Sequence, residues 1–133
     1  MLGDKPVMAV VPTHDLDKAR PFYEEQLGLR VDEETSLGSV LLAAGDGTTV
    51  LLYETQVAIP AEHTVATFLV DDVAATVEEL EARGVTFQEY DLQEFGYEDA
   101  PEGTTKVVEI PDAGASAWFT DPEGNILAVF SRA

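Results

Sequence analysis

The amino-acid sequence predicts one α+β domain built from two similar halves. Its 133 residues are the usual size of a single domain. With 45% hydrophobic residues, the chain can form a core, and without any cysteine it has no disulfide. The order strand, helix and three strands occurs twice, over about residues 6–55 and again over about 63–132. The pattern therefore indicates an internal duplication within one domain spanning 1–133.

The first half opens with an apolar run and an amphipathic helix. Residues 7–11 are apolar and rich in Val, which predicts a strand. Asp15 is suited to cap a helix, and apolar residues then recur at helical spacing. We expect a helix over about residues 17–26, with Gly28 as its stop, although Pro21 removes one backbone donor inside it.

Three strands are expected to complete the first half. Gly45-Asp46-Gly47 is a hairpin turn signal between the last two of them. Residues 56–62 contain Pro60 and are expected to link the halves. The expected strands cover residues 29–31, 39–44 and 48–54.

The same order of elements then returns. Residues 64–70 are expected to form a strand, Asp71-Asp72 to cap a helix, and Gly84 to end it. Residues 89–103 are acidic and irregular, with no Lys or Arg. Further strands are expected over residues 85–87, 106–110, 116–119 and 126–130.

Three short motifs lie in order along nearly the whole chain. The first is an Asp-led helix that contains Phe22-Tyr23 and ends in Leu27-Gly28-Leu29. The second covers residues 68–73, and the third is the Asp-Pro-Glu-Gly-Asn turn at 121–125. Together they resemble the vicinal-oxygen-chelate superfamily, the glyoxalase, bleomycin-resistance and extradiol-dioxygenase group. The resemblance implies two βαβββ modules whose mixed sheets curl into cups for small ligands, and a homodimer.

The same resemblance implies a divalent metal held by His, Glu or Gln side chains inside the cup. The positions that would supply these ligands carry apolar side chains here, which offer no nitrogen or oxygen donor. We therefore expect no metal cofactor. The alternative is Zn, Ni, Mn or Fe bound by displaced ligands from His14, His63, Glu54 and Glu109. The apolar residues at the usual ligand positions are Met8, Leu51, Val65 and Ala128.

The favoured function is binding of a small organic molecule, aromatic or cationic, without metal. The bleomycin-resistance branch, which sequesters a cationic drug, is the matching resemblance. One alternative is a metal-dependent glyoxalase-like lyase, isomerase or dioxygenase; another is an acid–base enzyme using Glu109 or Tyr53. By strand parity, the expected pocket residues are Met8, Val10, Leu51, Tyr53, Val65, Thr67, Glu109, Trp118, Ala128 and Phe130.

The net charge limits the class of partner. Twenty-six acidic and seven basic residues give −19 at pH 7, which disfavours nucleic acid and anionic membranes. Either a salty cytoplasm or attraction of a cationic ligand explains this charge. The sequence has no basic segment followed by an apolar one at its start, and its apolar runs are too short to span a bilayer. We therefore expect a cytoplasmic protein.

Overall fold

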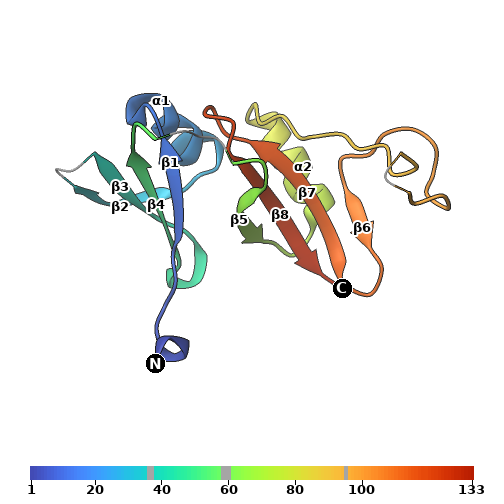
Figure 1. The fold of residues 1–133 in the computed structure, drawn as a ribbon, viewed down its shortest axis with the longest axis horizontal. Coiled ribbons are helices and arrows are strands. Elements are labelled where there is room, and N and C mark those ends of the chain that lie inside the picture. Colours follow the sequence, from blue (N-terminus) through green and yellow to red (C-terminus); the bar gives the residue numbers. More distant parts are fainter. Residues whose placement is uncertain (36–37, 58–60, 95) are drawn as a thin grey trace. The chain divides into compact units, whose positions relative to one another are not determined.

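The computed structural model describes residues 1–35, 38–57, 61–94 and 96–133, and it forms two compact units. The first unit consists of residues 1–66 with 121–126, and the second of residues 67–120 with 127–133. The described residues form two four-stranded sheets and two main helices in the expected order, so the α+β class and the βαβββ modules are confirmed (Figure 1). The sheets are twisted, but the strong curl that we expected is not seen.

The first sheet has the order β1-β4-β3-β2. Strand β1 runs parallel to β4, whereas β4–β3 and β3–β2 are antiparallel. Strand β1 continues through Pro12 and Thr13, two residues beyond the expected end. Because β1 is an edge strand, the missing N–H of Pro12 is tolerated there. The strands are β1 (Ala9–Thr13), β2 (Arg30–Thr35), β3 (Ser39–Ala43) and β4 (Thr49–Glu54).

A single helical segment follows β1. Helix α1 covers Leu16–Pro21, and its N-cap Asp15 accepts a hydrogen bond from the Lys18 N–H. The next turn, η2 (Phe22–Gln26), is a π-helix in which the Leu27 N–H donates to the Phe22 carbonyl at 2.9 Å. The expected helix is therefore present, with the wider turn directly after Pro21, where the regular hydrogen-bond ladder is interrupted. Gly28 ends it with a positive φ of 79°, as predicted.

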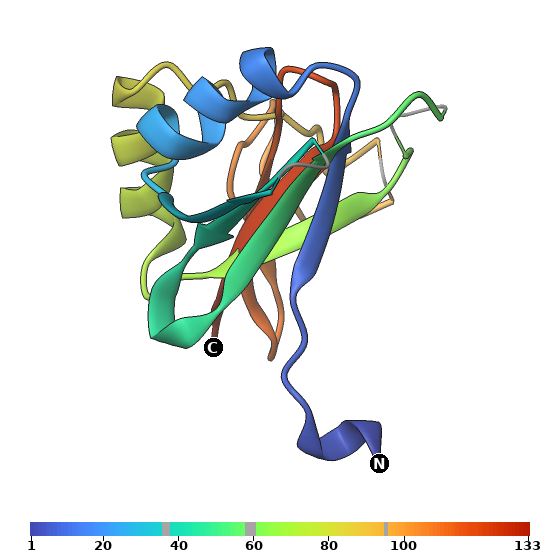
Figure 2. The ribbon, with the colours of Figure 1, turned by 90° about the vertical axis from the view of Figure 1, so that its left-hand side faces the viewer.

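The core of the first unit lies between α1 and one face of its sheet (Figure 2). Alternate residues of the strands point to this face, as the two-residue period of a strand requires. The helix contributes Phe22 and Tyr23, whose rings meet edge-on with centroids 5.3 Å apart. Strand residues that are completely buried in this core are Val11, Val40, Leu42 and Leu52.

The second sheet has the order β5-β8-β7-β6 and packs on helix α2 through β7. Asp72 caps α2 by accepting from the Ala75 N–H at 3.0 Å, while Asp71 makes no such bond. Gly84 follows the helix with φ 92°, as expected. The elements are β5 (Thr64–Leu69), α2 (Val73–Ala82), β6 (Val108–Ile110), β7 (Gly114–Thr120) and β8 (Ile126–Arg132).

The prediction of a strand over residues 85–87 is wrong, because in the described part of the chain this segment makes a single bridge, Phe87 with Phe119. Strand β6 pairs with the same edge of β7 further along, where Val108 faces Ser116. In this register Val108 takes the place that Tyr90 would occupy in a continuous strand. Residues 89–107, which we call the arm, are therefore inserted into the edge strand of the second sheet, and Figure 1 shows them projecting from it.

The turns and the chain start add smaller features. The hairpin turn η3 (Gly45–Gly47) is as expected, with Asp46 at a positive φ of 53°. An unexpected 3₁₀ turn, η1 (Leu2–Asp4), precedes β1 and projects away from it (Figure 2). Residues 58–60 of the expected linker, which include Pro60, lie outside the described residues. No helix in the described part of the chain is long and apolar enough to cross a membrane.

Candidate ligand-binding surfaces

The first sheet has a second face, turned away from α1, which we call the open face. In the strand register Val10 lies beside Leu51, and Leu51 beside Leu41. Tyr53, two residues further along β4, shares this face. Val10 is 47% exposed, and the other three are half-buried. Of the predicted pocket residues, Val10, Leu51 and Tyr53 therefore come together, while Met8 precedes β1 and is 44% exposed.

The row of residues across the open face ends in a carboxylate. Leu41 on β3 pairs with Glu33 on the edge strand β2, so Val10, Leu51, Leu41 and Glu33 follow one another across the sheet. Glu33 is exposed. The strand predicted over residues 29–31 ends before Glu33, whereas β2 continues to Thr35, with a register shift between Val31 and Glu33 that changes the alternation of faces. The open face thus combines an apolar strip with negative charge at its edge.

The second sheet also presents a face that points away from its helix. The buried residues of β7 and β8 alternate with Trp118, Ala128 and Phe130, which lie on the opposite face. Trp118 and Phe130 are half-buried, whereas Ala128 is only 2% exposed. The Trp118 ring meets Tyr90 edge-on at a centroid distance of 5.4 Å. These three predicted residues share one apolar and aromatic surface.

The remaining predicted pocket residues lie on the outer strands of the second sheet. Val65 on β5 is half-buried and Thr67 is exposed. Glu109 on β6 is exposed and pairs with Ala115. Ala115 is out of phase with Trp118, so the register places Glu109 on the face of the sheet that α2 covers, opposite to Trp118.

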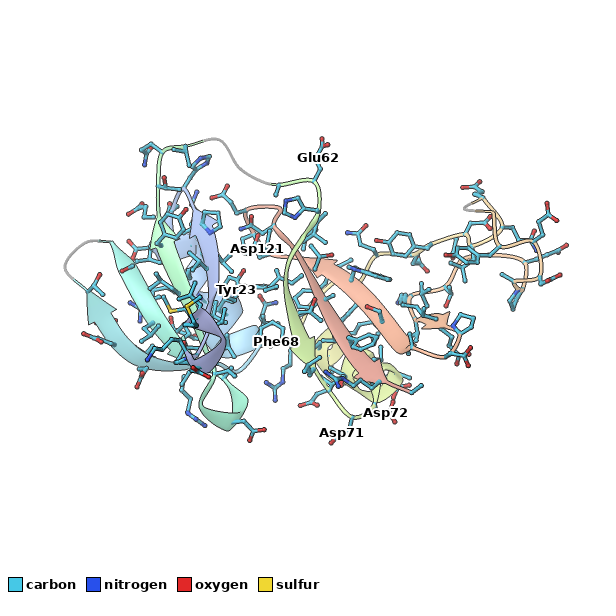
Figure 3. All side chains as sticks on the ribbon, turned by 60° about the horizontal axis from the view of Figure 1, so that its bottom comes forward. Tyr23, Glu62, Phe68, Asp71, Asp72 and Asp121 are labelled. Atoms are coloured by element: carbon cyan, nitrogen blue, oxygen red, sulfur yellow. The ribbon has the colours of Figure 1, made fainter. Side chains whose placement is uncertain are left out.

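A buried hydrogen-bond network holds the Asp-Pro-Glu-Gly-Asn turn within the first unit. The Tyr23 hydroxyl donates to Asp121 Oδ2 at 2.6 Å, and Figure 3 shows the two side chains together. Asp121 Oδ1 accepts from the Glu123 and Asn125 N–H groups at 2.9 and 2.8 Å. The Asn125 amide donates to Asp121 Oδ2 and to the Pro12 carbonyl, at 2.9 and 2.8 Å.

This hydrogen-bond network stabilises the fold. Tyr23 is completely buried, and burial together with the Asp121 carboxylate raises the pKa of its phenol well above the ordinary value. The phenol therefore stays protonated and acts as a hydrogen-bond donor rather than as a base. Asn125 is likewise buried, and it ties the turn to strand β1.

The ring of each histidine forms a hydrogen bond with a backbone carbonyl. His14 Nε2 lies 2.8 Å from the Val57 oxygen, and its Nδ1 lies 3.5 Å from Glu123 Oε2. His63 Nδ1 lies 3.1 Å from the Thr64 oxygen. Because a carbonyl oxygen only accepts, His14 Nε2 and His63 Nδ1 act as the donors in these two contacts.

Comparison with known proteins identifies the family. The family model described as the Glyoxalase/Bleomycin resistance protein/Dioxygenase superfamily matches residues 5–129. The chain belongs to this superfamily. A comparison with curated proteins finds no match.

Solved structures of the superfamily share the fold. TnmS3, an antibiotic-binding protein from Streptomyces sp. CB03234, is 25% identical with a TM-score of 0.67, and the match covers 98% of each chain. A glyoxalase/bleomycin resistance protein from the same source is 28% identical with a TM-score of 0.61, covering 91% of this chain and 95% of that one. Lactoylglutathione lyase from Agrobacterium tumefaciens is 20% identical with a TM-score of 0.68, covering 96% and 93%.

The superfamily implies a metal, but the residues at the implied positions do not fit one. Met8, Leu51, Val65 and Ala128 offer no nitrogen or oxygen side-chain donor. The displaced alternative requires His14, His63, Glu54 and Glu109 to converge. Among the described residues, no group of three or more His, Asp or Glu side chains is placed to hold a metal ion. We therefore derive no chemistry through a metal in this superfamily member.

Two features were missed in the sequence. The hydrogen bond between Tyr23 and Asp121 joins residues 98 apart, and each residue has an adequate local explanation, as core or as turn. The arm was treated as an irregular loop. The acidic composition of residues 89–103, which lack Lys and Arg, together with one strand too many in the second half, was the signal that an insertion interrupts an edge strand.

Proposed function

We propose that this protein binds a small, flat organic molecule, aromatic or cationic, on the apolar faces of its sheets and without metal. The supporting observation is the open face, where Val10, Leu51 and Leu41 form a partly exposed apolar row. Apolar surface with a few polar groups is the usual composition of a small-molecule site. Glu33 at the end of the row favours a cation over an anion.

The relatives support the same function. The resemblance to an antibiotic-binding protein extends over nearly the whole of both chains. Expected ligand contacts in the second sheet are Val65, Thr67, Trp118, Ala128 and Phe130. Glu109, which was also expected in this pocket, lies on the other face of the sheet. We also propose that the protein is a cytoplasmic homodimer, which light scattering at micromolar concentration tests; a monomer mass contradicts this part of the proposal.

A thermal-shift screen with a library of planar aromatic compounds, half of them cationic, tests the function. A compound present at about 100 times its Kd stabilises the protein by about 2.7 kcal/mol. For a chain of this length that raises Tm by roughly 8 °C. If no compound in the library raises Tm, the proposal is wrong.

A matched pair of variants locates the site. Val10→Arg places a long cationic side chain on the open face, so it should abolish the ligand-induced rise in Tm. Val57→Arg makes the same change at a residue that is 61% exposed and outside the strands, so the rise should remain. Loss of the rise in both variants, or in neither, contradicts binding at the open face.

A further inference from the structure

The arm borders a cavity that belongs entirely to the second unit. Its volume is about 1080 Å³, and the described residues that line it come from the arm, from β6 with the following Pro111, and from Ala74 at the start of α2. Small-molecule sites usually measure roughly 300–1,000 Å³. The cavity is therefore large enough for a drug-sized molecule. It lies on the side of Glu109, whereas Trp118 is on the other face of the sheet.

The arm is a loop with its own internal hydrogen bonds. Tyr90 and Thr105 close its base, since each N–H donates to the other residue's carbonyl at 2.8 Å. Nearer the tip, the Gln93 side-chain amide donates to the Ala100 carbonyl at 2.8 Å. These bonds define the wall of the cavity before any ligand binds, which lowers the entropy cost of binding.

The lining of the cavity combines apolar surface with negative charge. Tyr97 is 61% exposed and Ile110 is 40% exposed, and Val107, Val108 and Pro111 continue the apolar wall. None of the described residues that line the cavity is Lys, Arg or His. Among the described residues, none of the acidic side chains in the lining has a hydrogen-bond or ion-pair partner. These side chains are Glu98, Asp99, Glu102 and Glu109.

The lysine of the arm does not neutralise this charge. Lys106 is the one basic residue of the arm, and it is not part of the lining. Its Nζ lies 2.6 Å from Glu81 Oε2 on α2. That ion pair uses the lysine to anchor the base of the arm on the helix, so the carboxylates around the cavity remain uncompensated.

We propose that the arm cavity is a binding site for an organic cation with an aromatic or aliphatic body. The uncompensated carboxylates attract a positive charge and repel an anion. The exposed ring of Tyr97 offers a face on which a planar cation can lie. This proposal goes beyond binding at the open face, because it requires none of the open-face residues.

Fluorescence titration with 10-methylacridinium at low salt and near neutral pH tests the proposal. Uncharged acridine and anionic acridine-9-carboxylate are the matched probes, since they keep the ring system and change the charge. The cation should bind at least about tenfold more tightly than acridine, and the anion should not bind. Equal binding of the three probes overturns the proposal.

Two double variants separate the cavity from the overall charge of the protein. Glu98→Gln with Glu109→Gln removes two charges at the cavity, and it should weaken 10-methylacridinium binding about tenfold. Glu25→Gln with Asp32→Asn removes two exposed charges outside the lining of the cavity, and it should change binding less than about twofold. An equal loss in both double variants overturns the proposal, because it would show attraction by the general field alone.

Hydrogen exchange on the unmodified protein tests the cavity site without requiring that the variants fold. Bound 10-methylacridinium should slow exchange of the backbone amides of residues 96–111. Absence of that protection overturns the cavity site. Because the cation can also bind the open face, Val10→Arg serves as the second reference. Val10→Arg should leave the protection of residues 96–111 unchanged. The experiment therefore distinguishes failure of the cavity site from failure of the open-face site.

Discussion

At the scale of single residues, the hydrogen bond between Tyr23 and Asp121 is the contact that was hardest to predict from the sequence. Both side chains are buried, and the carboxylate accepts from a phenol, a side-chain amide and two backbone N–H groups. A carboxylate removed from water is tolerated only with such compensation. These hydrogen bonds together hold the turn at 121–125 in place. Each of them depends on the others.

Tyr23→Phe removes one donor to this carboxylate and should destabilise the protein by about 1–3 kcal/mol. Because the pKa of the buried phenol is raised, its proton stabilises the folded state below the ordinary pKa of about 10. This stabilisation is lost as the pH rises above that value, since only the unfolded state then ionises. Urea unfolding from neutral pH to above about pH 10 should show the wild type and Tyr23→Phe converging in stability.

Tyr53→Phe is the matched control for that measurement. Tyr53 lies half-buried on the open face, and its hydroxyl has no hydrogen bond among the described residues. Its removal should change the free energy of unfolding by less than about 0.5 kcal/mol. A constant difference between wild type and Tyr23→Phe across the pH range contradicts the raised pKa.

At the scale of elements, local sequence signals determined most of the fold. The caps Asp15 and Asp72, the stops Gly28 and Gly84, and the turn at 45–47 all act on the backbone within a few residues. Such signals can be read without knowing the tertiary structure, and the repeated order of elements then indicates the fold.

The elements that the sequence did not predict depend on distant partners. Residues 85–87 have a good strand composition, yet β6 occupies the remainder of the same β7 edge, so only one bridge forms. The register shift at Val31 and Glu33 depends on pairing with β3. Composition alone cannot reveal which segment takes a shared edge, or where a strand changes face.

The two adjacent aspartates before α2 provide a direct test of helix capping. Asp72 accepts the Ala75 N–H, while Asp71 has no bond to the helix, and Figure 3 shows both at the start of α2. Asp72→Ala should reduce the free energy of unfolding by about 1 kcal/mol, because it leaves a first-turn N–H without its partner. Asp71→Ala removes the same charge one residue away and should cost less than about 0.3 kcal/mol. Equal losses in urea unfolding would show that charge near the helix, not capping, is responsible.

At the scale of the whole molecule, the net charge of −19 dominates the electrostatics. The described ion pairs are few, and most acidic side chains are exposed, including those on β2 and on the arm. Mutual repulsion among these carboxylates opposes the compact state more than the expanded one. The charge therefore favours solubility and attraction of cations at the expense of stability in dilute buffer.

Screening should relieve this repulsion. The Debye length falls from about 10 Å at 0.1 M salt to about 3 Å at 1 M, which is shorter than the spacing of most surface charges. Raising sodium chloride over that range should therefore increase the free energy of unfolding by about 1–2 kcal/mol, measured by urea unfolding. Choline chloride should act similarly, because screening depends on ionic strength and not on the identity of the cation. Unchanged or lower stability would mean that the acidic surface is not an adaptation to salt, and would leave attraction of a cationic ligand as the explanation of the charge.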